Sequence, residues 1–368
     1  MSIASRLLDL AVQIQQIPAP TFEEKQRAEF VHEAFLKEKL LDVSMDSANN
    51  VFGRLAGEGK SRPLIVSAHL DTVFSRDISL KATRLEEQIY GPGIGDNALG
   101  AAALLGLLWA LRERQFHPAG DVWFVANICE EGLGDLRGMK AVADRFGADV
   151  QAYLVLEGTA LGQVYHRAIG VRRFRVTART AGGHSWSDYG QPSAVHELAR
   201  LITQIASLPV PTNPRTTLNV GLISGGTGIN VLASEAKFEL DLRSESIETL
   251  NTLVEKVEEK IRSANQEGVT IDMEVIGQRP AGEIPADHPL VKLAGQCISE
   301  QGLKATFTSG STDANIPLSR GYPAVVLGIT TGGGAHTVHE YINVQPVEKG
   351  IKQLVRFVEG IFSANNHQ

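Results

Sequence analysis

Two adjacent carboxylates, Glu130 and Glu131, end an apolar run in this sequence, DVWFVANICEE at residues 121 to 131. A run this short and rich in Val, Phe and Trp, with glycines close behind it, predicts a buried strand of a parallel sheet. Ligands of open α/β sheets bind outside the carboxyl ends of the strands, so both glutamates should reach a site. Because successive strand residues point to opposite faces, the two side chains should have different roles.

Other imidazole and carboxylate groups follow apolar runs or glycine-rich loops in the same way. The run PLIVSA at residues 63 to 68 leads into His69 and Asp71. One intervening residue places both side chains on one strand face, so Asp71 could hold one imidazole nitrogen and present the other to a metal. The remaining groups of this kind are Asp96, after the glycines of residues 91 to 95, Glu157, at the end of YLVLE, and His336, after glycines 332 to 334.

Mixed imidazole and carboxylate groups without a thiolate suit a catalytic metal site, with Zn²⁺ preferred and Mn²⁺ or Co²⁺ less frequent. These groups outnumber the ligands of a single tetrahedral zinc ion. Two ions about 3.5 to 4 Å apart, bridged by one carboxylate, would use five of them and leave one glutamate as a base. Taken alone, the Asp96 segment is also typical of a glycine turn with a helix N-cap, and the glutamate pair is typical of a solvated loop.

Periodicity along the chain predicts the elements that must position these groups. Residues 3 to 16 have helical spacing, and a capping box of Thr21 and Glu24 predicts a second helix that ends near Leu41. Further predicted elements are strands at 49 to 55, 63 to 68, 152 to 156 and 324 to 329, a hairpin at 80 to 90, and helices at 98 to 111 and 136 to 146.

A different pattern occupies residues 171 to 276. It predicts strand, helix, strand, strand, helix and strand, which is the ferredoxin-like order. Polar and apolar residues alternate in FRVTA and KFELDLR, which indicates a sheet covered on one face only. A chain of 368 residues is also long for a single core, so we expect two domains.

Composition narrows the class of protein. With 43% hydrophobic and 21% charged residues, the chain is typical of a soluble globular protein. A net charge of -7 argues against nucleic acid or an anionic membrane as partner. No run approaches the length of a membrane span and the first residues lack an export-signal pattern, so we expect a cytoplasmic location without membrane contact. Cys129 and Cys297 make no disulfide framework and are interpreted as packing residues.

Taken together, the motifs resemble one family of enzymes. HLDTV at 69 to 73, GDN at 95 to 97, the Glu130–Glu131 pair, Glu157 and HTVHE at 336 to 340 are similar, in order and spacing, to the motifs of the di-zinc metallopeptidases. That family includes glutamate carboxypeptidase, acetylornithine deacetylase, succinyl-diaminopimelate desuccinylase, aminoacylases and peptidase T. The resemblance covers nearly the whole chain.

The resemblance assigns roles to the motif residues. It implies two Zn²⁺ per chain, with Co²⁺ or Mn²⁺ possible, and Asp96 as the bridging ligand. Glu130 would be the general base, Asp71 would orient His69, and a cis peptide bond would follow Asp96. The implied metal ligands are His69, Asp96, Glu131, Glu157 and His336.

The resemblance also implies the domain organisation. It predicts an α/β catalytic domain of the zinc-exopeptidase type, with a mixed, mostly parallel central sheet flanked by helices, at residues 1 to 168 and 281 to 368. Residues 169 to 280 would form an inserted ferredoxin-like lid and dimerisation domain. In this family a histidine matching His184 reaches the partner subunit's site and stabilises the oxyanion, so a homodimer is expected.

Four further residues match substrate-side elements of the family. Asn230 ends GGTGIN at 225 to 230, and Ser311 and Asp313 lie in GSTDANIPLSRGYP at 310 to 323. Arg243 is a candidate clamp for a substrate carboxylate, although it could equally be a surface residue of a strand.

We therefore expect a di-zinc amide hydrolase, an exopeptidase that acts on small peptides with a free carboxylate. The alternative is an N-acyl amino acid deacylase of the acetylornithine deacetylase or desuccinylase type. Glu157 resembles the deacylases and carboxypeptidases, whereas GSTDANIPLSRGYP and GGGAHTVHE resemble peptidase T. Two other classes, a phosphoesterase and a binding domain without catalysis, are disfavoured by the lack of a basic phosphate cluster and by the intact Glu130.

Overall fold

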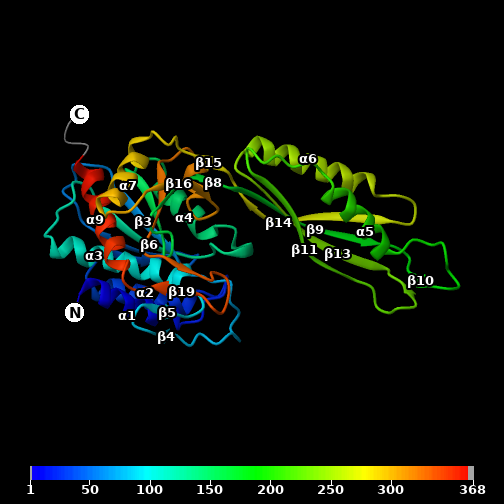
Figure 1. Ribbon diagram of the computed structural model, residues 1–368, viewed down its shortest axis with the longest axis horizontal. Helices are drawn as coiled ribbons and strands as arrows, with labels where there is room; N and C mark the ends of the chain where they lie inside the picture. The colour runs from blue at the N-terminus through cyan, green and yellow to red at the C-terminus, as the bar shows by residue number, and fades with distance from the viewer. Residues whose placement is uncertain (1, 364–368) are drawn as a thin grey trace. The chain divides into compact units, whose positions relative to one another are not determined.

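The computed structural model describes residues 2–363 and divides the chain into two compact units (Figure 1). The first unit contains the described residues up to Ala168 and from Glu283 onward, and the second is Ile169–Gly282. The units divide after residues 168 and 282. The sequence predicts boundaries after residues 168 and 280.

A mixed sheet forms the centre of the first unit. Its strand order is β1-β2-β6-β3-β7-β17-β8-β15, and β16 pairs with β8. The four middle strands, β6, β3, β7 and β17, run parallel. The strands are β1 (Leu41–Met45), β2 (Val51–Leu55), β3 (Leu64–His69), β6 (Val122–Asn127), β7 (Ala152–Glu157), β8 (Gln163–Ala168), β15 (Gly282–Glu283), β16 (Thr306–Gly310) and β17 (Ala324–Gly328). Every residue of β3 and β17 is buried, which explains their continuous apolar runs.

Helices flank this sheet, as predicted. The α3 helix packs on β6, β3 and β7, and α1 and α9 pack against α3 (Figure 1). The helices of the unit are α1 (Ile3–Gln15), α2 (Lys25–Lys37), α3 (Leu99–Glu113), α4 (Arg137–Phe146), α7 (Pro289–Glu300), α8 (Asn315–Ser319) and α9 (Val347–Ser363).

The helical segment Ile94–Glu113, which includes α3, corrects one expectation from the sequence. It is long and apolar enough to cross a membrane, although we expected no run of that kind. Within this segment, 94% of its most apolar stretch is buried inside the protein. Because its apolar surface is covered by other elements of the unit, this segment has the character of a core helix.

The predicted capping box of Thr21 and Glu24 is wrong. The α2 helix begins at Lys25 without a side-chain cap, because both side chains bind elsewhere. The Thr21 hydroxyl donates to Asp71 Oδ2 at 2.9 Å. The Glu24 carboxylate accepts the N–H groups of Phe22 and Cys129 at 2.9 and 3.2 Å. The start of α2 is therefore tied to the segments that carry Asp71 and Glu130.

A small antiparallel sheet joins two loops of the first unit. It has the order β18-β19-β5-β4. Its strands are β4 (Thr83–Arg84), β5 (Gln88–Tyr90), β18 (Gly332–Gly333) and β19 (Tyr341–Asn343). This pairing brings the loop that carries His336 beside the glycine-rich loop before Asp96.

The second unit has the predicted ferredoxin-like arrangement, with antiparallel strands in the order β14-β9-β13-β11. Its main elements are β9 (Gly170–Arg179), α5 (Ala194–Ala206), β11 (Thr216–Gly225), β13 (Glu235–Ser244), α6 (Ile247–Ser263) and β14 (Thr270–Arg279). Both helices pack on this sheet (Figure 1), over buried side chains such as Phe174 and Phe238. On alternate positions, Arg173 and Arg175 form ion pairs with Asp241 and Glu239, so charge replaces apolar packing there.

A buried arginine holds the end of β3 in place. The Arg27 guanidinium donates to the carbonyl oxygens of Ile17 and Leu70 at 2.7 and 2.6 Å, and the side chain is 1% exposed. Burial lowers the pKa of Arg27 to about 10, although Asp71 and Glu24 act in the opposite direction. Leu70 lies between His69 and Asp71, so this contact fixes the strand end from which both side chains project.

We predict that Arg27→Lys lowers the free energy of unfolding by about 2 kcal/mol, because a lysine ammonium lacks the planar fork with which the guanidinium reaches carbonyl groups in two segments. Urea denaturation would measure the loss. The matched control is Arg84→Lys, at an exposed arginine paired with Asp9, which should change stability by less than about 0.5 kcal/mol. Equal effects of the two substitutions would show that the buried fork does not stabilise the fold.

Candidate active site

The five predicted metal ligands meet at the carboxyl ends of the central strands, in two sets that share Asp96. The first ligand set is His69, Asp96 and Glu157. Its His69 Nε2 lies 3.1 Å from Asp96 Oδ1 and 3.9 Å from Glu157 Oε2. In each set, the potential ligand atoms lie within 4.8 Å of one another.

The second ligand set is Asp96, Glu131 and His336. His336 Nε2 lies 3.0 Å from Asp96 Oδ2 and 3.0 Å from Glu131 Oε1. Asp96 therefore turns one carboxylate oxygen toward each histidine, as a bridging carboxylate must.

Asp71 fixes both the histidine and the glutamate pair. It is fully buried, and its two oxygens accept the N–H groups of Glu130 and Glu131 at 2.9 and 2.8 Å. His69 Nδ1 is 3.1 Å from the Asp71 carbonyl oxygen and 3.5 Å from its carboxylate. With Nδ1 facing these acceptors, Nε2 is the ring nitrogen turned toward Asp96 and Glu157.

The site has more carboxylates than positive groups. Burial opposes protonation of His69, yet the Asp71 and Asp96 carboxylates raise its pKa well above the ordinary value. Hydrogen bonds with Asp96 and Glu131 raise the pKa of His336 to about 10. Burial raises the pKa of Glu157, and the neighbouring carboxylates Asp96 and Glu130 add to this effect, although His69 opposes it. The site thus favours added positive charge, and its oxygen and imidazole donors fit divalent ions such as Zn²⁺.

Glu130 and Glu131 lie beyond β6, which ends at Asn127, so the alternation expected from a continuous strand does not extend to them. Glu131 belongs to the second ligand set, whereas Glu130 belongs to neither. Both are largely buried. The chain turns sharply around them, because Cys129, Asp135 and Leu136 have positive φ angles of 56°, 58° and 59°, which non-glycine residues seldom adopt. Glu130 thus lies next in the chain to the ligand Glu131 without belonging to either ligand set.

Asn97 is a functional residue that sequence reasoning missed. Its amide donates to the Leu156 carbonyl at 2.8 Å and accepts the Gly158 N–H at 3.0 Å. These contacts hold the Asp96 loop against the strand end that carries Glu157. The peptide bond between Asp96 and Asn97 is cis, as the resemblance implies. A sequence signal was available, since Asn97 directly follows a candidate ligand.

Glu340 was also missed, although it ends the HTVHE motif at residues 336 to 340. Its side chain is 1% exposed and accepts three N–H groups of the loop before α3. Burial raises its pKa to about 7, although the backbone donors oppose this shift. The available signal was a glutamate four residues after the candidate ligand His336, in a chain whose glycine-rich loop at residues 91 to 95 offers backbone N–H donors. His339, by contrast, is exposed.

Three predicted substrate-side residues lie in the second unit. His184 Nδ1 accepts the N–H groups of Trp186 and Ser187 at 3.2 and 3.4 Å. The neighbouring strands β10 (Gly183–His184) and β12 (Val231–Leu232) pair. Asn230, just before β12, accepts the Ser185 N–H on its backbone carbonyl oxygen. Arg243 is partly exposed and pairs with Asp241 at 2.6 Å.

Ser311 and Asp313 belong to the first unit. Ser311 is half-buried, whereas Asp313 has no exposed surface and accepts a hydrogen bond from Asn127 at 2.7 Å. Asp313 therefore contacts the end of β6 through Asn127, and its role toward substrate stays a prediction.

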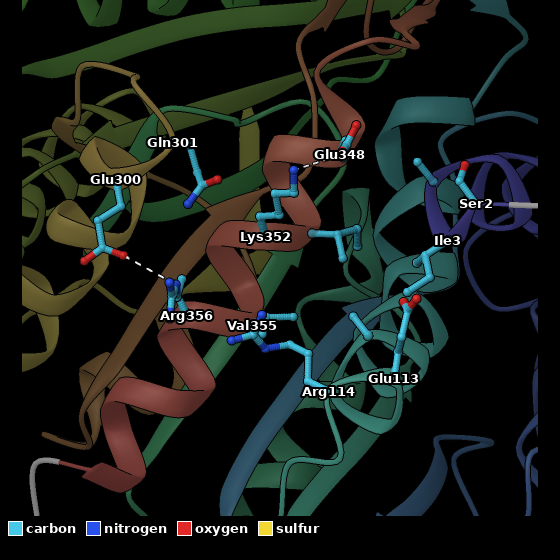
Figure 2. Close-up of a pocket in the computed structure, with 13 residues that line it drawn as sticks. Ser2, Ile3, Glu113, Arg114, Glu300, Gln301, Glu348, Lys352, Val355 and Arg356 are labelled. Atoms are coloured by element: carbon cyan, nitrogen blue, oxygen red, sulfur yellow. Dashed lines mark hydrogen bonds and ion pairs between the residues drawn. The ribbon is translucent and has the colours of Figure 1, made fainter.

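A separate surface cavity of about 850 Å³ lies among α1, α3, α7 and α9 (Figure 2). Several of its charges are paired with one another, for example Lys352 with Glu348 at 2.6 Å and Arg356 with Glu300 at 3.8 Å. The α3 helix starts beside Asp96 and reaches this cavity with its last residue, Glu113, about 22 Å further along. The cavity is therefore remote from the two ligand sets.

Comparison with known proteins agrees with this geometry. The chain is 25% identical over 347 residues to a succinyl-diaminopimelate desuccinylase of Corynebacterium glutamicum, covering 92% of each protein. It is 23% identical to carboxypeptidase G2 of a Pseudomonas species, covering 84% of this chain and 76% of that one. The names of these two relatives, a desuccinylase and a carboxypeptidase, correspond to the deacylase and exopeptidase activities expected from the motifs.

Solved structures share the fold. A tripeptidase from Staphylococcus aureus superposes with a TM-score of 0.84 at 23% identity, covering 98% of this chain and 99% of its own. Aminopeptidase PepT of Bacillus cereus gives a TM-score of 0.80 at 21% identity, covering 97% and 98%. The model of the peptidase family M20/M25/M40 matches residues 65–360. This match takes in the five candidate ligands, and the chain belongs to peptidase family M20/M25/M40.

Proposed function

We propose that this enzyme is a two-metal amide hydrolase that removes a terminal residue from small peptides with a free carboxylate. The observation that carries the proposal is the shared Asp96, with one oxygen toward His69 and the other toward His336, while Glu130 stays outside both sets. Zn²⁺ is the proposed ion, because the donors are imidazole and carboxylate groups without thiolate.

The first ligand set would hold one ion and the second ligand set the other. Bound ions would supply Lewis acidity toward the amide carbonyl and would lower the pKa of water. The Glu130 carboxylate takes the proton from the attacking water and returns it to the leaving amine nitrogen. The N–H contacts with Asp71 hold the peptide backbone at Glu130 and Glu131 during both transfers.

His184 is proposed as the donor to the oxyanion. Its Nδ1 accepts backbone N–H groups, so the neutral ring carries its proton on Nε2. A neutral Nε2–H can donate to the negative oxygen that forms when the carbonyl is attacked.

A homodimer through residues 169 to 280 is the proposed assembly. Support comes from large apolar side chains around His184 that are almost fully exposed in the single chain: Trp186 at 86%, Tyr189 at 88% and Ile229 at 104%. The edge strand β11 adds exposed Leu222 and Ile223. Apolar groups gathered in this way are typical of a surface that a partner covers.

An N-acyl amino acid deacylase is the second candidate, favoured by Glu157 in the first ligand set and by the desuccinylase relative. In either case Arg243 is the proposed partner of the substrate carboxylate. A cytoplasmic location is also retained as a proposal, supported by the two buried free cysteines, Cys129 and Cys297.

Replacing the base tests the reaction directly. We expect Glu130→Gln to lower kcat on dipeptides, tripeptides and N-acyl amino acids by roughly 10²- to 10⁴-fold while two ions remain bound, because a base and not a ligand is lost. Steady-state assays on that substrate panel and elemental analysis would measure both effects. Glu131→Gln is the comparison, since it removes a ligand and should also lower metal content. Full activity of Glu130→Gln would contradict the assigned role.

Metal removal tests the two ligand sets. Dialysis against a chelator should abolish hydrolysis and lower the melting temperature, and Zn²⁺ should restore both at two ions per chain. An ion present at 100 times its Kd stabilises the folded state by about 2.7 kcal/mol. Calorimetric melting with and without Zn²⁺ would measure the shift. Saturation at a single ion per chain would refute the two-metal site.

Mixing two inactive chains tests action across the dimer. Glu130→Gln and His184→Ala chains, mixed equally and allowed to exchange subunits, should recover about a quarter of wild-type activity, because half of the dimers would hold one complete site. Each variant mixed with itself is the control. If verified heterodimers stay inactive, His184 does not act in the partner's site.

A further inference from the structure

We propose that Glu340 is a positioning residue that sets the affinity of the second ligand set, Asp96, Glu131 and His336, for its metal ion. The inference rests on the two-metal site of the proposed function. It assigns to Glu340 the task of locking the loop before Asp96 onto the loop that carries His336.

The contacts of Glu340 carry the proposal. Oε1 accepts the N–H groups of Gly95 and Asp96 at 2.7 and 2.8 Å, and Oε2 accepts that of Gly93 at 2.8 Å. Its backbone carbonyl accepts a fourth, from Gly91 at 2.9 Å. Four donors of one short loop thus converge on one residue of the other loop, and a buried carboxylate with several N–H partners holds its position firmly.

The loop before Asp96 is shaped to receive this carboxylate. A Cβ atom on Gly95 would lie 3.1 Å from Glu340 Oε1 and 2.5 Å from a methyl group of Thr159. Gly93 adopts a φ of 74°, which also favours glycine. The two glycines therefore let the loop backbone approach Glu340 closely, and their N–H groups donate to its carboxylate.

His336 depends on such a lock more than the other ligands do. It has a φ of 64°, its side chain is 54% exposed, and it follows a run of three glycines. Ordering a loop of this kind costs conformational entropy. Glu340, four residues further along, ties the loop to the N–H of Asp96 itself, whose Oδ2 faces His336 at 3.0 Å.

The first ligand set is held by other side chains. Asp71 orients His69, and Asn97 ties the Asp96 loop to the strand end of Glu157. Loss of the Glu340 carboxylate should therefore weaken mainly the second ion, by roughly the 10- to 100-fold typical of residues that orient metal ligands.

Glu340→Gln is the informative substitution, because it keeps the size of the side chain but replaces one acceptor oxygen with a donor that faces a backbone N–H. Glu340→Asp keeps the charge but is one methylene shorter, so it should fail in the same way. The matched control is Asp121→Asn, where a carboxylate accepts the Gly57 N–H at 2.8 Å near the opposite end of β6.

The test is calorimetric titration of chelator-treated protein with Zn²⁺. We expect the Asp121→Asn protein to bind each of two ions as tightly as the wild-type protein does. Both Glu340 variants should bind the first ion with wild-type affinity and the second at least about 10-fold more weakly than wild type. Melting temperatures measured in chelator show whether each variant is folded. If Glu340→Gln is not folded, the titration of Glu340→Asp tests the inference.

Three outcomes overturn the inference. A folded Glu340 variant that binds both ions like wild type, or that weakens both steps equally, shows that Glu340 does not position the second ligand set. A wild-type protein that binds fewer than two ions overturns the two-metal proposal itself, and this inference with it, so the two failures are distinguishable.

Discussion

Crowding of negative charge at one edge of the central sheet is the constraint on which this structure depends. Five carboxylates, those of Asp71, Asp96, Glu130, Glu131 and Glu157, lie together with two imidazoles. Burying like charges is unfavourable unless donors compensate them. Here the backbone supplies donors, since the N–H groups of Gly91, Gly93, Gly95 and Asp96 point at Glu340 and those of Glu130 and Glu131 point at Asp71. The loops at this edge are shaped by that requirement as much as by the substrate they serve.

Much of this arrangement could be predicted from the sequence because its signals are local. Strands buried on both faces leave continuous apolar runs, as in β3 and β17, and their ends mark where ligands converge. Alternation along β9 and β13 likewise predicted a sheet with one apolar face. The remaining features depend on distant partners. Thr21 and Glu24 match a helix cap locally. Thr21 instead donates to Asp71, 50 residues away, and Glu24 accepts the N–H of Cys129, 105 residues away, besides that of Phe22. No local pattern records that competition.

Arg243 illustrates why the role of a residue can stay open when its position is known. Asp241 accepts Arg173 on one oxygen at 2.9 Å and Arg243 on the other at 2.6 Å. A single carboxylate therefore accepts two guanidinium groups. The Arg243 guanidinium, 43% exposed, suits an anionic group of a substrate, and it equally suits a strand surface where ion pairs alternate. Both interpretations made from the sequence are therefore compatible with the same contacts.

The interior helix α3 also determines when the chain can finish folding during its synthesis. At Gly106, where an added Cβ atom would lie 2.2 Å from Leu7 of α1 and 3.2 Å from Ile351 of α9, the helix is covered by both ends of the chain. The α1 helix leaves the ribosome before α3, whereas α9 is made well after it. An apolar segment long enough to cross a membrane thus stays partly uncovered until about 240 further residues have been added. Until α9 docks, that face of α3 is open to other apolar surfaces.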